Sequence, residues 1–189
     1  MKGLQGQARI KLRKNKIIRG LLMFKTTEEF LLNWEHETKS TQKILDALTD
    51  ESLAQEVSPE DRTLGRIAWH IVATLHEMVS QTGLGFEAPP HDAPVPKTAA
   101  EIAEVYRTTN IAMVAAIKEQ WTNEVLDEKK DMYGEQWSVG TILSVLTSHQ
   151  IHHRGQMTIL MRQAGLRVPG VYGPAREEWA MFGGQAPVI

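Results

Sequence analysis

The amino-acid sequence predicts an all-α fold, an antiparallel four-helix bundle. Apolar residues recur at helical spacing in four stretches, and each stretch begins near a residue that caps helices well. No segment shows the sustained alternation of apolar and polar residues that is typical of a strand. Helices of about 20 residues are about 30 Å long, which suits a bundle. A chain of 189 residues has the length of one domain.

The first two helices are marked by capping residues. Thr26, with a glutamate three residues on, forms a capping box, and the apolar stripe that follows predicts a helix over 27–48. The second helix has two possible starts, Ser58 and Thr63. It is expected to run to about Gln81, because two glycines follow closely.

The second half of the chain repeats this pattern after a long connection. Residues 84–97 contain four prolines and are expected to form an extended loop that crosses an end of the bundle. Thr98 opens a third helix with a second capping box, and Ser138 caps a fourth helix that stops at Gly165. The tail from Leu166 is rich in proline and glycine and is predicted to be irregular.

The charged residues divide the chain into two parts. Residues 1–22 hold seven lysines and arginines and no acidic residue, whereas residues 23–189 hold 14 basic and 23 acidic residues. We interpret 1–22 as a disordered leader or an upstream start, with Met23 opening the bundle domain. The leader lacks the apolar run of a signal peptide, and no stretch is long enough for a membrane span. We therefore expect a cytoplasmic protein without a membrane partner.

The absence of cysteine limits the chemistry that the chain can perform. It excludes disulfide scaffolds, thiolate metal sites and a cysteine nucleophile. Seven histidines remain as the soft metal ligands besides methionine.

Two histidines of the fourth helix are placed to share a metal ion. His149 and His153 are i and i+4, so their side chains lie one turn apart on the same helix face. His149 and His152, at i and i+3, also have a suitable spacing. The apolar stripe of this helix favours His149 and His153 as the inward pair and places His152 toward the edge. His70 interrupts an apolar run of the second helix and is the third candidate.

The alternative interpretation is a set of hydrogen-bonded core histidines without metal. Two inward histidines at i and i+4, with a third on another apolar helix, favour a metal site. The patterns His-Glu-x-x-His of zinc proteases and Glu-x-x-His of di-iron bundles are both missing. A mononuclear site with three histidine ligands is left, and such a site keeps a position open for water or substrate. Zinc, nickel and iron all suit three neutral imidazoles.

Residues around the fourth-helix histidines have competing interpretations. Gln156 is either an amide that supports His153 or a surface residue. Gly155 is unfavourable inside a helix, so we attribute it to close helix approach. Arg154 is expected to pair with an acidic neighbour, and binding a substrate carboxylate is its alternative role. His152 and Arg154, like Gln156, are candidates for residues that contact the metal-binding histidines without binding the ion themselves. The remaining histidines, His36, His76 and His91, are treated as structural or solvated.

These motifs resemble the DinB/YfiT-like family of metal-binding helical bundles over about residues 24–180. The specific stretch is 149–156 (HQIHHRGQ), and the weaker ones are 64–71 (LGRIAWHI), 137–140, 160–165 and 168–174 (VPGVYGP). The resemblance implies an up-down-down-up bundle, a homodimer and one divalent metal held by His70, His149 and His153. Some members of that family are thiol-dependent.

Two classes of function follow. The first is a metal-dependent enzyme that acts on a small molecule, as a thiol-dependent transferase or isomerase or as a hydrolase. Its thiol would be a low-molecular-weight compound, because the chain has no cysteine. The alternative is a non-catalytic metal-binding protein of a stress or damage response. Nucleic-acid binding is disfavoured, because the acidic balance of 23–189 repels phosphates.

Overall fold

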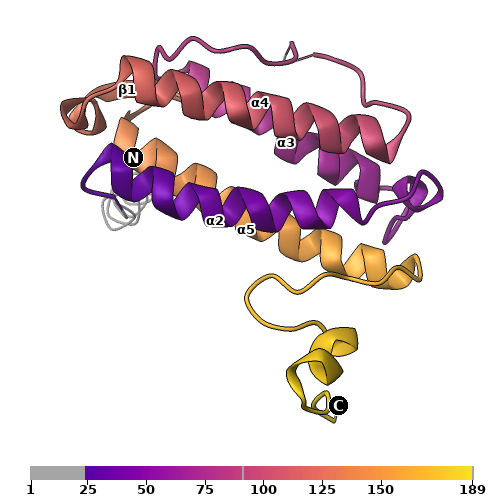
Figure 1. Cartoon of the computed structure of the whole chain (residues 1–189). Coiled ribbons are helices and arrows are strands. Elements are labelled where there is room, and N and C mark those ends of the chain that lie inside the picture. The colour runs from indigo at the N-terminus through magenta and orange to yellow at the C-terminus, as the bar shows by residue number, and fades with distance from the viewer. Residues whose placement is uncertain (1–23, 91, 189) are drawn as a thin grey trace, which may run out of the picture.

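The protein is described by a computed structural model that covers residues 24–90 and 92–188 and is mostly helical (Figure 1). The interpretation of residues 1–22 and the assignment of His91 lie outside the described residues. The four long α-helices are α2 (Thr27–Asp46), α3 (Leu64–Ser80), α4 (Ala99–Gln120) and α5 (Val139–Gln163). The short 3₁₀ helices are η1 (Glu51–Ala54), η2 (Asn123–Asp127) and η3 (Arg176–Phe182). All four predicted helices are therefore present.

The long helices lie alongside one another, with α2 and α3 each packed against both α4 and α5. In Figure 1, α2 and α5 run in one direction and α3 and α4 in the other. The order is thus up-down-down-up, as the family resemblance implies, and only two of the four neighbouring pairs are antiparallel. Because α3 and α4 run parallel, the segment between them returns along the length of the helices. The expectation that it crosses one end was wrong.

Each long helix begins at a side chain that accepts a hydrogen bond from the backbone N–H three residues on. These caps are Thr26, Thr63, Thr98 and Ser138. Thr63, not Ser58, is therefore the start of α3. The capping box at Thr98 is confirmed, whereas the one predicted at Thr26 is incomplete, because the Glu29 carboxylate accepts from the backbone N–H of Lys25 instead. Gly165 follows the end of α5 with a φ of +77°, which glycine adopts readily.

A small antiparallel sheet contradicts the expectation of an all-α chain. Strands β1 (Lys129–Met132) and β2 (Glu135–Ser138) pair with Met132 opposite Glu135 and Lys129 opposite Ser138. Two residues connect them, Tyr133 at φ +56° and Gly134 at φ +80°, as in a tight hairpin turn. Strands of four residues are too short to show a sustained period of two, so the pattern search missed them. The hairpin leads directly into α5, because Ser138 also caps that helix.

The proline-rich connection is held against the helices by a tryptophan. The indole Nε1 of Trp69 on α3 donates to the carbonyl oxygen of Ala93 at 3.2 Å. On the other side of the core, Trp34 Nε1 donates to Asn110 Oδ1 at 2.7 Å and thereby links α2 to α4. Both tryptophans are buried, so their rings also pack in the core.

The tail after α5 is less irregular than predicted, because it contains η3. Figure 1 shows it leading away from the long helices. Val168 is buried, and Arg162 of α5 forms an ion pair with Glu177, one bond of which is 2.9 Å long. These contacts attach the tail to the end of α5.

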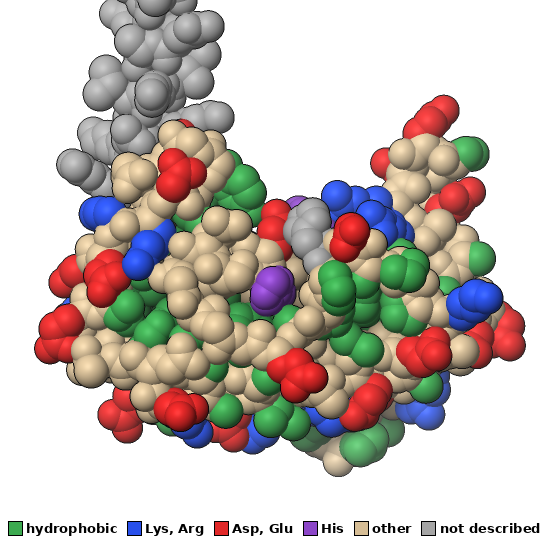
Figure 2. All heavy atoms as spheres, turned by 90° about the horizontal axis from the view of Figure 1, so that it is seen from above, with side chains coloured by type: hydrophobic (Ala, Val, Ile, Leu, Met, Phe, Trp, Pro, Cys, Tyr) green, Lys and Arg blue, Asp and Glu red, His purple; other side chains and the backbone are tan. Residues whose placement is uncertain are grey.

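The surface carries the acidic balance that the sequence predicts. On the face seen in Figure 2, acidic side chains are spread from one end of the molecule to the other. Among residues 24–90 and 92–188, no helix combines the length and apolar character required of a membrane span.

Close backbone approach occurs at a different glycine from the one expected. A Cβ at Gly155 would have no neighbour within 4 Å among the described residues, so the attribution of Gly155 to close helix approach was wrong. A Cβ at Gly65, in contrast, would lie 3.0 Å from Leu53 Cβ and 3.1 Å from its carbonyl oxygen. Gly65 therefore permits η1 to pack directly on the first turn of α3.

We predict opposite effects for alanine at these two glycines. Gly65→Ala should lower the free energy of unfolding by about 1–3 kcal/mol, because the added methyl group overpacks the contact with η1. Gly155→Ala should raise it by up to about 1 kcal/mol, because alanine favours an exposed helix position. Urea denaturation of metal-free protein measures both. Equal changes in the two variants would contradict the assignment of the close approach to Gly65.

Candidate metal centre

Helices α3 and α5 bring three histidines to one point. His70 comes from α3, and His149 and His153 come from consecutive turns of α5. One ring nitrogen from each lies within 4.8 Å of the other two, so the group could hold a metal ion. The Nε2 atoms of His70 and His149 are 3.1 Å apart. The ring centroids are separated by 4.4 to 4.9 Å, with the rings edge to face.

The three rings are half-buried, whereas the sequence predicted that His149 and His153 point into the core. The core positions of this part of α5 are Gln150 and Arg154, each one residue further along. Because α5 packs against both α2 and α3, its buried surface is wide. The histidines face α3, and the two polar residues face α2. A helical wheel gives the direction of each side chain but not which neighbouring helix lies in that direction, so the sequence alone does not assign these two faces.

The surroundings keep the imidazoles neutral. Burial lowers the pKa of both His70 and His149 to about 4, and the charge of Arg62 adds to the effect at each. The pKa of His153 is lowered for the same reasons, although its hydrogen bond to Gln156 opposes the shift. Neutral imidazole is the form that binds metal ions. The His149 Nδ1 atom is buried and has no hydrogen-bond partner among the described residues.

Gln156 lies beside the group and contacts two histidines. His153 Nδ1 is 2.7 Å from Gln156 Oε1, and the Gln156 amide nitrogen is 3.2 Å from His152 Nε2. Both contacts are satisfied when His153 donates from Nδ1 and the amide donates to His152. We assign this tautomer, which leaves the Nε2 lone pair of His153 free to act as a ligand. His152 itself is exposed, and its role as a residue that supports the three histidines stays a prediction.

Arg154 points away from the histidines and forms a buried ion pair. The side chains of Arg154 and Glu37 are only 2% and 4% exposed, and their charged atoms are 2.6 Å apart. Arg154 also donates to the carbonyl oxygen of Glu37 and to the hydroxyl groups of Thr41 and Tyr172. The tail residue Tyr172 in turn donates to Glu37 at 2.6 Å. The expected pairing with an acidic neighbour is confirmed, and none of the contacts of Arg154 is with the three histidines.

Gln150 extends this network to every long helix. Its carbonyl oxygen accepts hydrogen bonds from Thr41 of α2 and Tyr106 of α4, at 3.2 and 3.1 Å. Its amide nitrogen donates to the carbonyl oxygen of Ile71 on α3 at 3.3 Å. Burial raises the pKa of Tyr106, so its hydroxyl group remains a donor. Gln150 therefore links α5 to the three other long helices at the level of the histidines.

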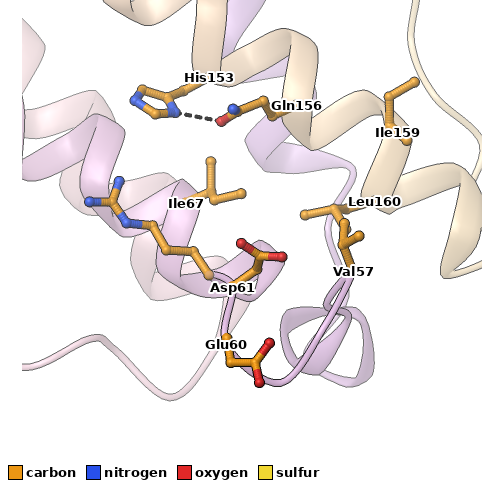
Figure 3. A pocket seen from close by; sticks show the side chains of 9 residues that line it. Val57, Glu60, Asp61, Ile67, His153, Gln156, Ile159 and Leu160 are labelled. Carbon is orange, nitrogen blue, oxygen red and sulfur yellow. Dashed lines mark hydrogen bonds between the residues drawn. The ribbon is translucent and has the colours of Figure 1, made fainter.

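A cavity of about 620 Å³ opens beside His153 (Figure 3). Residues of the loop before α3, of α3 and of α5 line it. Its apolar lining consists of Val57, Ile67, Ile159 and Leu160. Its polar and charged lining consists of His153, Gln156, Glu60, Asp61 and Arg62. The group of three histidines therefore has a space beside it that a small molecule can enter.

Sequence reasoning missed part of this arrangement. Glu37 and Thr41 are i and i+4 on α2, and so are Gln150 and Arg154 on α5, which is a signal for two facing polar pairs. The loop residues that line the cavity carry no periodic signal, because a loop has none. Only the tertiary structure brings Arg62 to the histidines.

Fold and site together define a helical protein in which two helices bring three histidines to one place beside a cavity. The DinB family profile matches residues 23–187. The chain belongs to the DinB family, as its motifs predict.

Several relatives support this assignment. YrdA of Bacillus subtilis (strain 168) is 54% identical over 165 residues, which cover 87% of this chain and 99% of YrdA. The crystal structure of a DinB-like protein from Bacillus cereus ATCC 10987 matches with a TM-score of 0.77 at 53% identity, over 79% of this chain and 100% of that one. The DinB-like protein YjoA of Bacillus subtilis matches with a TM-score of 0.62 at 19% identity, over 76% and 96% of the two chains. At that identity YjoA supports the fold alone.

We predict that the buried ion pair matters far more to stability than an exposed pair on the same helix. Arg154→Met should lower the free energy of unfolding by about 3–5 kcal/mol, because Glu37 is left buried and unpaired. Arg162→Met breaks the more exposed pair with Glu177 and should cost no more than about 1 kcal/mol. Chemical denaturation of both variants measures the difference. A similar, small loss in both would contradict the importance of the Arg154–Glu37 pair.

We also predict an acid-sensitive stability in the metal-free protein. Unfolded histidines take up protons near pH 6.5, whereas folded His70 and His149 do so only near pH 4. Their stabilising contribution is therefore complete above about pH 6.5 and is lost as the pH falls toward 4. His70→Gln should lose less stability between pH 7.5 and 5 than the wild type, measured by urea denaturation. His36→Gln, outside the group, is the matched control, and equal pH slopes in wild type and His70→Gln would refute the prediction.

Proposed function

We propose that this DinB protein binds one divalent metal ion through His70, His149 and His153. The observation that carries the proposal is the approach of three ring nitrogens to within 4.8 Å of one another. Two Nε2 atoms 3.1 Å apart are close enough to share one ion, to which histidine nitrogens bond at about 2.0–2.1 Å. The depressed pKa values of His70 and His149 favour the same role, because the rings stay neutral at physiological pH without a proton to displace.

The surrounding residues support the orientation of the ligands. Gln156 holds His153 by its Nδ1 atom, and such outer contacts orient imidazole ligands in metal sites. The lowered pKa values prevent the two α5 rings from repelling each other as cations. Three imidazoles accept zinc, nickel or iron, so the donor set favours no single one of these metals.

We further propose that the bound ion makes the protein an enzyme acting on a small molecule. A divalent ion on three neutral imidazoles supplies a Lewis acid that activates water or a low-molecular-weight thiol. The cavity beside His153 supports this reading, since a structural metal site is normally closed by its protein ligands. Thiol-dependent transfer or isomerisation and hydrolysis are both compatible with such a site. In the alternative function, that of a non-catalytic metal-binding stress protein, the ion would only stabilise the fold.

Metal binding is tested on the full chain, purified without a histidine tag, stripped with a chelator and reloaded. We expect about one zinc, nickel or ferrous ion per chain by elemental analysis. His70→Ala, His149→Ala and His153→Ala should each weaken binding at least ~100-fold, because each removes a direct ligand and loss of an outer contact alone costs about 10–100-fold. His76→Ala is the matched control, since His76 lies on α3 but packs against Phe86. A wild type that binds no ion, or ligand variants that bind as the wild type does, would refute the proposal.

The two functions differ in what the loaded site accepts. If the protein is an enzyme, the cobalt-substituted form should change its visible absorption when glutathione or a bacillithiol-type thiol is added. It should also convert epoxide or halogenated probes in a screen, and His149→Ala should abolish both effects. If the ion is structural, loading should raise the melting temperature strongly while the spectrum stays unchanged with every thiol.

A further inference from the structure

An arginine without an ion-pair partner lies next to the histidine group. Arg62 precedes the cap of α3, lines the same cavity as His153, and forms no ion pair or hydrogen bond among the described residues. Burial is the first cause of the lowered pKa of His70, His149 and His153, and the charge of Arg62 adds to it at each ring, which places Arg62 within electrostatic reach of all three. In this chain, Arg154 and Arg162 by contrast are neutralised by glutamates.

Two arginines act on the histidines. Arg66 acts on His70 in addition to Arg62, whereas no carboxylate contributes to the pKa shift of any of the three rings. Of the two acidic residues of the cavity, one has a hydrogen-bond partner and the other lies away from His153. Asp61 accepts a hydrogen bond from Ser58, and Glu60 lies on the side of the cavity far from His153 in Figure 3. A divalent ion would add to this positive charge, because imidazole ligands bring no negative charge.

Part of the cavity wall is apolar. Ile67 of α3 and Leu160 of α5 are buried side chains that line it, and Val57 and Ile159 line it with exposed ones. Such a space favours an apolar body, and Arg62 is the one cation among the charged residues of its lining, which are Glu60, Asp61 and Arg62. A guanidinium is suited to this task, since its planar fork matches the two oxygens of a carboxylate.

We infer that the cavity takes a small molecule with a carboxylate on an apolar body, and that Arg62 binds the carboxylate. The inference deepens the proposed function, because a ligand held in this way would present its other end to the histidine group. It also transfers to Arg62 the role of carboxylate binding that the sequence left open for Arg154. Arg154 is unavailable, since its guanidinium is buried against Glu37.

The test compares two probes of the same shape, hexanoate and hexanamide, by titration calorimetry or ligand-observed NMR. The full chain is used both loaded with zinc and metal-free, and the zinc content is measured in every sample. We expect hexanoate to bind wild-type protein at least ~10-fold more tightly than hexanamide, as charge-assisted bidentate hydrogen bonds provide. Arg62→Gln should reduce this preference to within about threefold while zinc content stays at the wild-type level.

Two further variants make the result specific. Arg62→Lys should restore part of the preference, because it keeps the charge but loses the planar fork. Arg167→Gln removes an exposed arginine that does not line the cavity and should leave the preference intact. Circular dichroism melting verifies that each variant is folded.

The outcomes separate the two proposals. Zinc-loaded wild type that binds both probes equally, or Arg62→Gln that keeps the preference for hexanoate, overturns the inference and leaves the metal site standing. Wild type that binds no zinc refutes the metal site. In that case the metal-free titration still decides the inference, since preference for hexanoate that depends on Arg62 supports it and absence of preference overturns it.

Discussion

The rotation of α5 about its axis is the constraint on which the candidate metal centre depends. Gln150 and Arg154 fix this rotation, because both are buried and bond with α2 through Thr41 and Glu37. A helix turned by even part of a turn would leave a buried amide and a buried guanidinium without partners, which is costly. His149 and His153 each precede one of these residues. Their direction toward α3 is therefore set by a network that contains neither of them.

The axial position of the two helices is set by the same network. Gln150 donates to the carbonyl oxygen of Ile71, so the residue after His149 is bonded to the residue after His70. This contact holds the two histidines at one level and is consistent with their Nε2 separation of 3.1 Å. A sliding of α5 along α3 would break the hydrogen bond before it separated the rings far. Ligand positions held by packing and outer hydrogen bonds are the requirement for a preorganised site.

Most of the helical framework could be predicted from the sequence, because caps and apolar spacing are local signals. Thr26, Thr98 and Ser138 were identified in this way, as was the spacing of His149 and His153. The hairpin could not be found by periodicity, because its strands are too short to repeat a pattern. The sequence also could not predict how far each face of α5 is buried, since this burial depends on which helices flank α5. The same holds for Arg62, whose place beside His153 arises from a loop and two helices distant in sequence.

The distribution of charge gives the site a character that the whole chain lacks. Residues 23–189 are acidic overall, yet Arg62 and Arg66 add to the lowering of the His70 pKa that burial causes first. A positive charge at the cavity favours a small anion there, as the inferred role of Arg62 requires. Burial is the main reason that the imidazoles stay unprotonated, and the charge of Arg62 adds to its effect. Under the inference drawn above, Arg62 serves both the neutral state of the histidines and the selection of the ligand.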